Sequence, residues 1–192
     1  EQGIFRLDNL KRYATRFNLE QAVSDKIKVG MQNQLTYYNQ NNRRDPLNIA
    51  NKIDPLGAAR DENGSVIVFP NNGKDINPLA DELDGNYQNN TRTIRTFLTG
   101  YATYQILPSL SLRSNVGLTL GNARTGTYFG SNTVDRNGSV PTASYGTQMD
   151  TNWSWENILN FNKTFGDHSI TATGVTSLLT FKTEQSRAQG AN

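Results

Sequence analysis

Apolar and polar residues alternate along several stretches of the chain, most clearly from Leu107 to Leu120 (LPSLSLRSNVGLTL). The leucines and the valine after Ser109 share one parity, which only Ser114 interrupts, whereas polar residues such as Arg113 occupy the other. Successive side chains of a β-strand point to opposite faces, so this period of two predicts a strand with one apolar and one polar face. The apolar face would meet a second sheet in a soluble sandwich, but lipid in a membrane barrel.

Six such runs occur, and short connections join them in pairs. The connections contain two or three residues drawn from Ser, Asp, Lys, Gly and Pro, which suits tight hairpin turns. The predicted hairpins are Arg12–Val23 with Ile27–Tyr38, Thr91–Leu107 with Leu110–Leu120, and Thr151–Phe165 with His168–Phe181. The predicted fold class is therefore all-β, an antiparallel sheet of about six long strands in three hairpins.

The connections between the hairpins are long and polar. One is Asn39–Asn90, within which Ser65–Phe69 predicts a short strand, and the other is Gly121–Asp150. Structureless loops beyond about 15 residues are uncommon in compact soluble domains, whereas outer-membrane barrels combine short periplasmic turns with longer extracellular loops. Strands of about eleven residues, tilted by ~45°, cross about 26 Å, close to the apolar band of an outer membrane. The pattern thus favours a transmembrane β-barrel over a soluble sandwich.

Each predicted strand except the last has one apolar parity, which we expect to face lipid. Besides the leucines of the opening stretch, this parity holds Tyr13, Phe17, Leu19, Ile27, Val29, Met31, Leu35, Tyr37, Ile94, Leu98, Ala102, Tyr104, Ile106, Trp153, Trp155, Leu159 and Phe161. The opposite parity suits a wet lumen and holds Arg12, Arg16, Asn18, Glu20, Lys28, Gln32, Gln34, Arg95, Arg113, Asn115, Glu156, Asn160 and Asn162. Tyr37, Trp153 and Trp155 adjoin the long loops, where an outer aromatic girdle belongs. The facing of His168–Phe181 stays open, because small residues and leucines occupy both parities.

Composition narrows the class of protein. The 192 residues have a mean hydropathy of -0.64, and no apolar run approaches the ~20 residues of a membrane-spanning helix, although a barrel remains compatible. A net charge of +2 is too small to indicate a nucleic-acid partner. With no cysteine, disulfides, thiol catalysis and cysteine metal sites are excluded. Because the chain begins at Glu1 and ends in a polar tail, Glu184–Asn192, we expect it to be a segment of a longer protein.

Candidate catalytic and metal-binding residues are few. His168 is the only histidine and precedes Ser169, but it lies beside a predicted tight turn, so we expect a structural residue and no enzyme activity. The acidic stretch Asp81–Asn86 carries oxygen ligands before a glycine, yet it does not match a calcium-binding loop. We expect it to be a solvated acidic loop, with calcium binding left open. No cofactor is expected.

Four aromatic residues lie in the predicted loops: Tyr87, Tyr128, Phe129 and Tyr145. Aromatic rings in this position could stack on sugars, contact a lid protein, or pack the loops against one another. The residues alone do not distinguish these roles, and they identify no individual substrate-binding residue.

Four stretches resemble the SusC/RagA-type TonB-linked outer-membrane transporters: Arg16–Gly30, Asn77-Pro78-Leu79, Gly100–Leu118 and Trp153–Val175, with the Phe-Gly-Asp-His turn among the most specific parts. The resemblance runs over nearly the whole chain, residues 1–192, in the family's order and spacing. It implies a plugged barrel of ~22 strands, of which this chain would form about a quarter, without the plug domain and the C-terminal strands.

The same resemblance implies a function and partners. It implies TonB-energised import of oligosaccharides or peptides across the bacterial outer membrane, beneath a SusD-like surface lipoprotein that acts as a lid. Two other hypotheses stay open on the residues: a non-importing outer-membrane barrel, such as a porin or an adhesin, and a soluble secreted β-sandwich that serves as a binding module.

Overall fold

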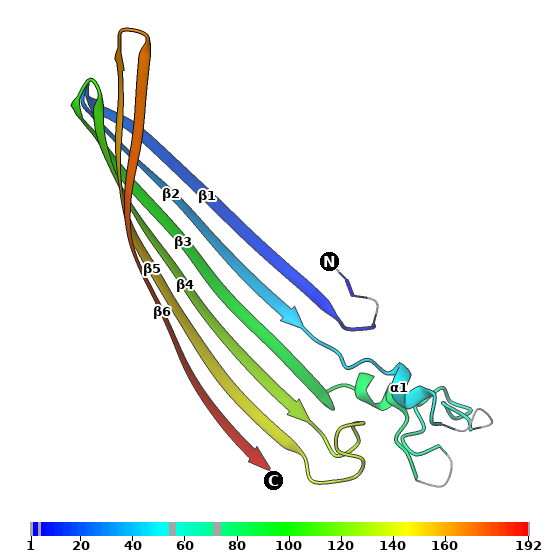
Figure 1. Cartoon of the computed structure of the whole chain (residues 1–192). Helices are drawn as coiled ribbons and strands as arrows, with labels where there is room; N and C mark the ends of the chain where they lie inside the picture. Colours follow the sequence, from blue (N-terminus) through cyan, green and yellow to red (C-terminus); the bar gives the residue numbers. More distant parts are fainter. Residues whose placement is uncertain (1, 4, 54–56, 71–73, 192) are drawn as a thin grey trace.

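Six antiparallel strands form a single sheet in chain order (Figure 1). The computed structural model describes residues 2–3, 5–53, 57–70 and 74–191. The strands are β1 (Asn9–Ser24), β2 (Ile27–Asn41), β3 (Tyr87–Leu107), β4 (Leu110–Phe129), β5 (Thr142–Phe165) and β6 (His168–Ala191). The described residues also contain one helical turn, α1 (Leu47–Ala50), and a 3₁₀ helix, Pro78–Glu82, and neither could cross a membrane. The predicted all-β fold with three hairpins is confirmed.

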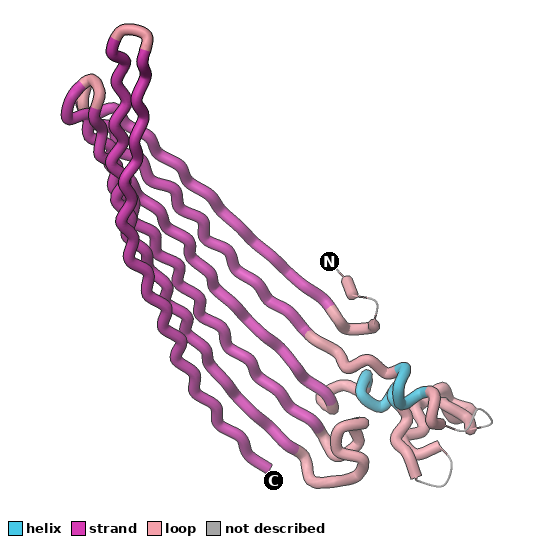
Figure 2. The backbone as a smooth tube through the Cα atoms, in the orientation of Figure 1, coloured by secondary structure: helices cyan, strands magenta, loops and turns pink. Residues whose placement is uncertain are grey.

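The two ends of the sheet differ. Tight turns of two residues join β1 to β2, β3 to β4 and β5 to β6 at one end, as Figure 2 shows. In the last turn Gly166 has a φ of 58°, in the left-handed region that glycine adopts without strain. The long connections and both ends of the chain lie at the other end (Figure 1). Short and long connections therefore segregate as the sequence predicts.

The strands extend further toward the long connections than predicted. β4 continues to Phe129 and β5 begins at Thr142, so the second long loop shrinks from Gly121–Asp150 to residues 130–141. β6 runs to Ala191 through the expected polar tail. In these extensions both parities are largely polar, so no hydrophobic alternation marks them, yet backbone pairing with the neighbouring strand continues. The predicted strand Ser65–Phe69 is wrong, since only an isolated bridge joins Arg60 to Val66.

The register between strands decides which side chains share a face. Val116 pairs with Gly100 on β3 and with Trp155 on β5, while Gly100 pairs with Met31 on β2 and Met31 with Leu19 on β1. Paired residues of antiparallel strands point to the same side. The residues expected to face lipid therefore share one face, which we call the apolar face, and those expected in the lumen share the other, the polar face. Only Ile106 is not paired, because it lies where the register shifts between Gln105 and Leu107.

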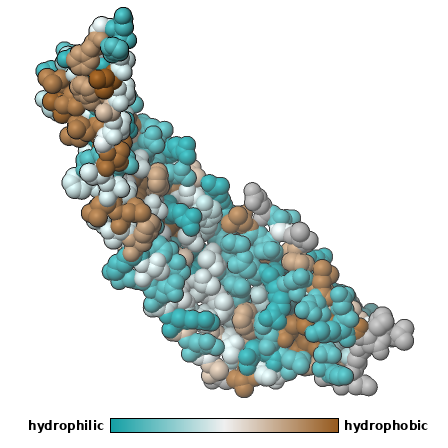
Figure 3. All heavy atoms as spheres, in the orientation of Figure 1, coloured by the Kyte–Doolittle hydropathy of each residue, from teal (hydrophilic) through white to brown (hydrophobic). Residues whose placement is uncertain are grey.

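Nothing among the described residues covers the apolar face. Val116 is 52% exposed, Trp155 47% and Phe17 55%. The buried hydrophobic residues of the described chain are Ile76 and Ala80, both in the long connection after β2, so the sheet itself has no core. In Figure 3 hydrophobic residues are densest over the turn end, and hydrophilic residues predominate over the other half. A β-sandwich would bury this face under a second sheet, and the described strands form only one.

The register also assigns the faces of β6, which the sequence left open. Leu178 pairs with Trp155, so it lies on the apolar face together with Ile170. Val175, Leu179 and Phe181 lie on the polar face, and all three are more than half exposed. β1 and β6 are the edges of this open sheet.

Candidate functional site

The two long connections pack against each other at the end of the sheet that faces away from the tight turns. We call the described part of residues 42–86, together with residues 130–141, the loop unit. Asn86 joins its halves: its side-chain nitrogen donates to the carbonyl oxygens of Ala80 (2.8 Å) and Asn132 (2.9 Å), and its own carbonyl accepts from the amide of Gly130 (2.8 Å). Thr133 is fully buried beside this junction and donates to the Gly130 carbonyl. These contacts hold the loops in one arrangement.

Asp81 forms a second tie between the halves. Its carboxylate is largely buried and accepts a hydrogen bond from the amide of Val134 (2.9 Å), while Arg44 forms an ion pair with Asp135 nearby. Burial raises the pKa of Asp81 above its ordinary value of 3.8, and the Val134 hydrogen bond and the charge of Arg43 oppose this shift. Asp81 is therefore a buried acceptor, so the expectation of a solvated acidic loop is wrong for this residue, whereas Asp84 of the same stretch is exposed.

Asn77 organises the longer half of the loop unit. It is 4% exposed, and its side-chain nitrogen donates to the carbonyls of Ala59 (2.9 Å) and Ile67 (3.0 Å). Its side-chain oxygen accepts from the amide of Leu79 (3.1 Å) and so caps the 3₁₀ helix. Around Ser65–Phe69 the backbone bonds instead to two different segments: the Ile67 amide donates to the Ala59 carbonyl (3.1 Å), and the Val68 carbonyl accepts from the Asn77 amide (2.9 Å). Pairing with residues 59–61 therefore stops at the single Arg60–Val66 bridge.

An apolar hollow of about 370 Å³ lies in the longer half of the loop unit. Its apolar lining includes Pro46, Ala50, Ile53, Pro70, Pro78 and Leu79. A hollow of this size and chemistry can accept an apolar side chain from another molecule.

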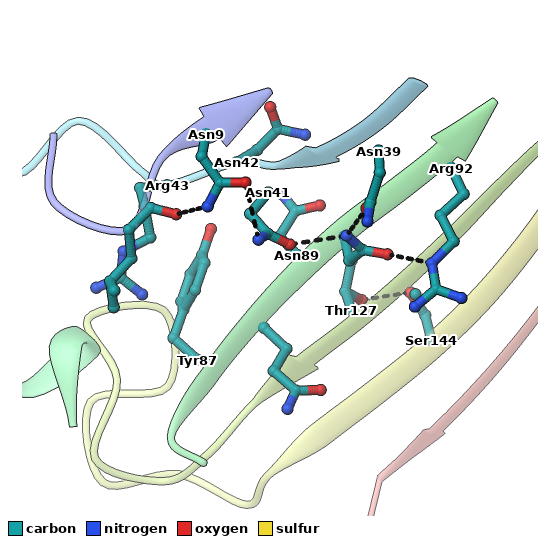
Figure 4. A pocket seen from close by; sticks show the side chains of 14 residues that line it. Asn9, Asn39, Asn41, Asn42, Arg43, Tyr87, Asn89, Arg92, Thr127 and Ser144 are labelled. Carbon is teal, nitrogen blue, oxygen red and sulfur yellow. Dashed lines mark hydrogen bonds between the residues drawn. The ribbon is translucent and has the colours of Figure 1, made fainter. Parts of the chain in front are cut away.

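A polar hollow of about 680 Å³ lies where the strands approach the loop unit (Figure 4). Four of its lining residues, Asn9, Asn39, Asn41 and Asn90, form what we call the asparagine cluster. The Asn90 side-chain nitrogen donates to the side-chain oxygens of Asn39 and Asn41 (both 2.7 Å), and that of Asn41 donates to Asn9 (3.3 Å). Arg92 donates from Nε to the Asn90 side-chain oxygen (3.2 Å). By register, the cluster lies on the apolar face, beyond Tyr13 on β1 and Tyr37 on β2, and in the same row as Tyr145 on β5.

The four aromatic residues assigned to loops belong to strands. Tyr87 and Phe129 pair across β3 and β4, with ring centroids 5.0 Å apart, and the Arg43 guanidinium lies 4.6 Å from the centre of the Tyr87 ring. These two rings therefore pack against each other. Tyr128 and Tyr145 lie on the apolar face and are exposed (36% and 52%).

The polar face carries a hydrogen-bonded network at its centre. The Arg113 guanidinium stacks on Tyr101, 3.9 Å from the ring centre, and Nε donates to the Asn115 side-chain oxygen (2.8 Å). Asn115 donates in turn to a carboxylate oxygen of Glu156 (3.0 Å). The Tyr101 ring lies over Gly30, where a Cβ atom would approach the ring to 2.3 Å. The network gives this face charged and hydrogen-bonding groups across β3 to β5, which water can hydrate.

The remaining candidate residues do not form a chemical site. His168 is the first residue of β6, pairs with Phe165 and lies at the turn end, away from the loop unit. Within the acidic stretch, Asp81 binds Val134 and Glu82 forms an ion pair with Arg6 (3.5 Å). The described part of the chain holds no cluster of three or more histidine and carboxylate side chains that could bind a metal ion.

Comparison with known proteins shows similarity in structure. No protein-family model and no curated protein matches the chain. The RagAB peptide importer in its closed-closed state matches 96% of this chain with a TM-score of 0.74 and 17% identity, and in its open-open state 96% with 0.75 and 17%. A further RagAB peptide transporter structure matches 95% with 0.71 and 17%. This chain covers 21–22% of those chains, so it spans about a fifth of their length. At this identity the similarity shows the fold.

We expect Asp81→Ala to loosen the loop unit, because the Val134 amide loses its acceptor, at a cost of ~1–3 kcal/mol. Asp81→Asn is the matched control, since it keeps an acceptor oxygen and removes a charge that burial disfavours. Limited proteolysis within residues 130–141, in the protein that carries this chain, measures the effect. Cleavage should accelerate for the alanine variant only, and equal rates for all three proteins would contradict the proposed tie.

The same carboxyl predicts a pH dependence. Its pKa is raised in the folded state, so the folded protein holds this proton to a higher pH than the open loop does. The stability of the loop unit should therefore fall as pH rises from 3.8 through the folded pKa, and Asp81→Asn should remove that change. Proteolysis rates at several pH values test this, and a rise in stability across the window would contradict it.

Proposed function

We propose that the chain is a segment of the barrel wall of a TonB-energised outer-membrane importer of the SusC/RagA type, which takes up peptides or oligosaccharides. The observation that carries this proposal is the uncovered apolar face between three tight turns and an ordered loop unit. The fold similarity to RagAB importer chains supports it, and so does the sequence resemblance along nearly the whole chain. Those neighbours are described as peptide importers or transporters, which makes peptides the first substrates to test.

In this proposal the apolar face contacts the lipid of the outer membrane. Exposing apolar area to water costs a free energy of about 25 cal/mol per Å². An apolar face as wide as this one therefore requires an apolar cover. Tyr13 and Tyr37 stack with centroids 6.4 Å apart near the loop end of the face, where an interfacial girdle belongs. Trp153 and Trp155, expected in that girdle, instead lie in the middle of β5, where Trp155 pairs with Val116. The tight turns are then periplasmic and the loop unit is extracellular.

The polar face lines the lumen and the loop unit forms part of the mouth. The Arg113–Asn115–Glu156 network offers donors and acceptors to a hydrated substrate such as a peptide backbone. A SusD-like lipoprotein docks on the loop unit, whose apolar hollow can receive one of its side chains. TonB acts through segments outside this chain. The chain itself performs no catalysis and binds no cofactor in this account.

A non-importing barrel, such as a porin or an adhesin, would share the sheet and its two faces. The loop unit favours the importer. Its asparagine and aspartate ties fix one arrangement of about fifty residues, which suits a docking surface.

The facing of the sheet can be tested with a pair of adjacent substitutions on β4. Val116→Arg in the full-length protein should cost ~2–4 kcal/mol, because the charge would face hydrocarbon near the middle of the bilayer. Asn115→Arg should cost far less, since its side chain points to the water-filled side. Unfolding of the protein from bilayers by denaturant measures both, and equal costs would refute the lipid-facing assignment.

The function can be tested by shortening the loop unit. Arg44 and Pro78 line one small hollow of about 60 Å³, so a short Gly-Ser linker can replace residues 45–76 without stretching the chain. We expect normal barrel assembly but loss of growth on the cognate peptide and of capture of the partner lipoprotein. The readouts are growth with peptides as sole nitrogen source and co-purification of the lipoprotein.

The matched control places the same linker after Gly166, in the tight turn at the opposite end, where uptake should be retained. If cells with the shortened loop import the peptide and capture the lipoprotein as well as the parent does, the non-importing barrel is favoured instead.

A further inference from the structure

A row of cationic residues crosses the apolar face where it ends toward the loop unit. Lys11 pairs with Asn39, Asn39 with Arg92, and Arg92 with Arg124, so these four residues of β1 to β4 lie side by side on one face. We call them the cationic row. All three cations are exposed.

The two arginines of the cationic row are unfavourably placed for an isolated protein. Paired residues on neighbouring strands have Cβ atoms about 4.5–5.5 Å apart, and like charges directly opposite destabilise the sheet. The ion pairs among the described residues are Arg6–Glu82, Arg44–Asp135 and Lys182–Glu184, and none includes the cationic row. Arg92 donates only to the neutral Asn90 among its described hydrogen-bond partners. An anion from outside the chain would remove this repulsion.

Carboxylates are scarce on the whole apolar face. Alternation from the register leaves a single acidic residue on this face within the six strands, Glu184 on β6, and Lys182 binds it at 3.0 Å. The positive charge of β1 to β4 is therefore not neutralised on this face by the strands themselves.

The neighbours of the cationic row change in a fixed order along the strands. One row toward the turns lie Tyr13, Tyr37 and Ile94. Beyond them lies the rest of the apolar face toward the turns, which we call the apolar band. One row toward the loop unit lie Asn9, Asn41 and Asn90, followed by Gly126 on β4, where a Cβ atom would meet nothing within 4 Å, and by Tyr145 on β5. Neighbouring rows on one face are about 7 Å apart, because they are two positions apart along each strand. Along β1 the order is therefore apolar, aromatic, cationic, amide.

We propose that the cationic row and the asparagine cluster bind the phosphorylated sugar headgroup of a glycolipid in the outer leaflet. The inference rests on the proposed function in one respect, namely that the apolar face contacts the membrane. Acyl chains would then lie on the apolar band, phosphate on the arginines and sugar hydroxyls on the amides. The planar guanidinium matches phosphate oxygens in a bidentate manner, and amides both donate to and accept from hydroxyls. The adjoining apolar band selects a lipid over a soluble anion.

The test uses the full-length protein in detergent micelles, titrated with a bisphosphorylated diglucosamine glycolipid and with its dephosphorylated form. Binding is read from native mass spectrometry and from the unfolding temperature. Arg92→Gln/Arg124→Gln should bind the phosphorylated lipid at least tenfold more weakly. Without lipid, this variant should unfold at the same or a higher temperature, because the repulsion between the arginines is gone.

The matched control is Lys28→Gln/Arg95→Gln, which removes two charges from the polar face of β2 and β3 and should bind the glycolipid as the parent does. Equal binding by the arginine variant, equal binding of the dephosphorylated lipid, or full competition by inorganic phosphate would each overturn the inference. The Val116 and Asn115 variants report facing separately. If the glycolipid proposal fails while Val116→Arg still destabilises the protein in the membrane, the proposed importer function stands.

Discussion

A slip of one residue between any two neighbouring strands would move every side chain of one strand to the opposite face. The rest of the structure depends on this register. It aligns Leu19, Met31, Val116 and Trp155 across four strands, joined through Gly100 on β3, and so assembles one apolar face from separate alternating runs. The tight turns fix the register at one end of each hairpin. Since the sheet has no core of its own, the apolar face must be stabilised by its surroundings, which in our account is lipid.

The loop unit is stabilised by a different kind of interaction from the sheet. It buries little hydrophobic area, and side-chain amides take the place of a core: Asn77 and Asn86 each bind two backbone carbonyls at 2.8–3.0 Å. Such hydrogen bonds contribute about 1 kcal/mol each when satisfied and cost more when one partner is lost. The loops can therefore hold a specific shape at the end of the sheet. A shape of this kind can bind a partner while the strands provide a rigid frame.

The alternation of apolar and polar residues predicted the hairpins and the residues that lie on each face, because this alternation is visible in the strand sequences between Arg12 and Phe165. It did not predict the outer parts of β4, β5 and β6, where polar and small residues, such as Thr and Gly, occur on both parities and pairing with a neighbour imposes the strand. The facing of Leu178 follows only from its pairing with Trp155. The asparagine cluster was missed because Asn39 and Asn90 meet across 51 positions of the chain. A signal was present in the asparagines at alternate positions 39 and 41.

The central claim is that one face of the sheet meets lipid as far as the cationic row. Single nitroxide labels placed from Leu110 to Phe129, in the full-length protein in bilayers, test it through collision with oxygen, which concentrates in hydrocarbon. The account predicts high oxygen accessibility at even positions from Leu110 to Leu120, low accessibility at odd positions, and loss of the alternation beyond Asn122. Oxygen accessibility without a period of two, or with its maxima at the odd positions, would contradict it.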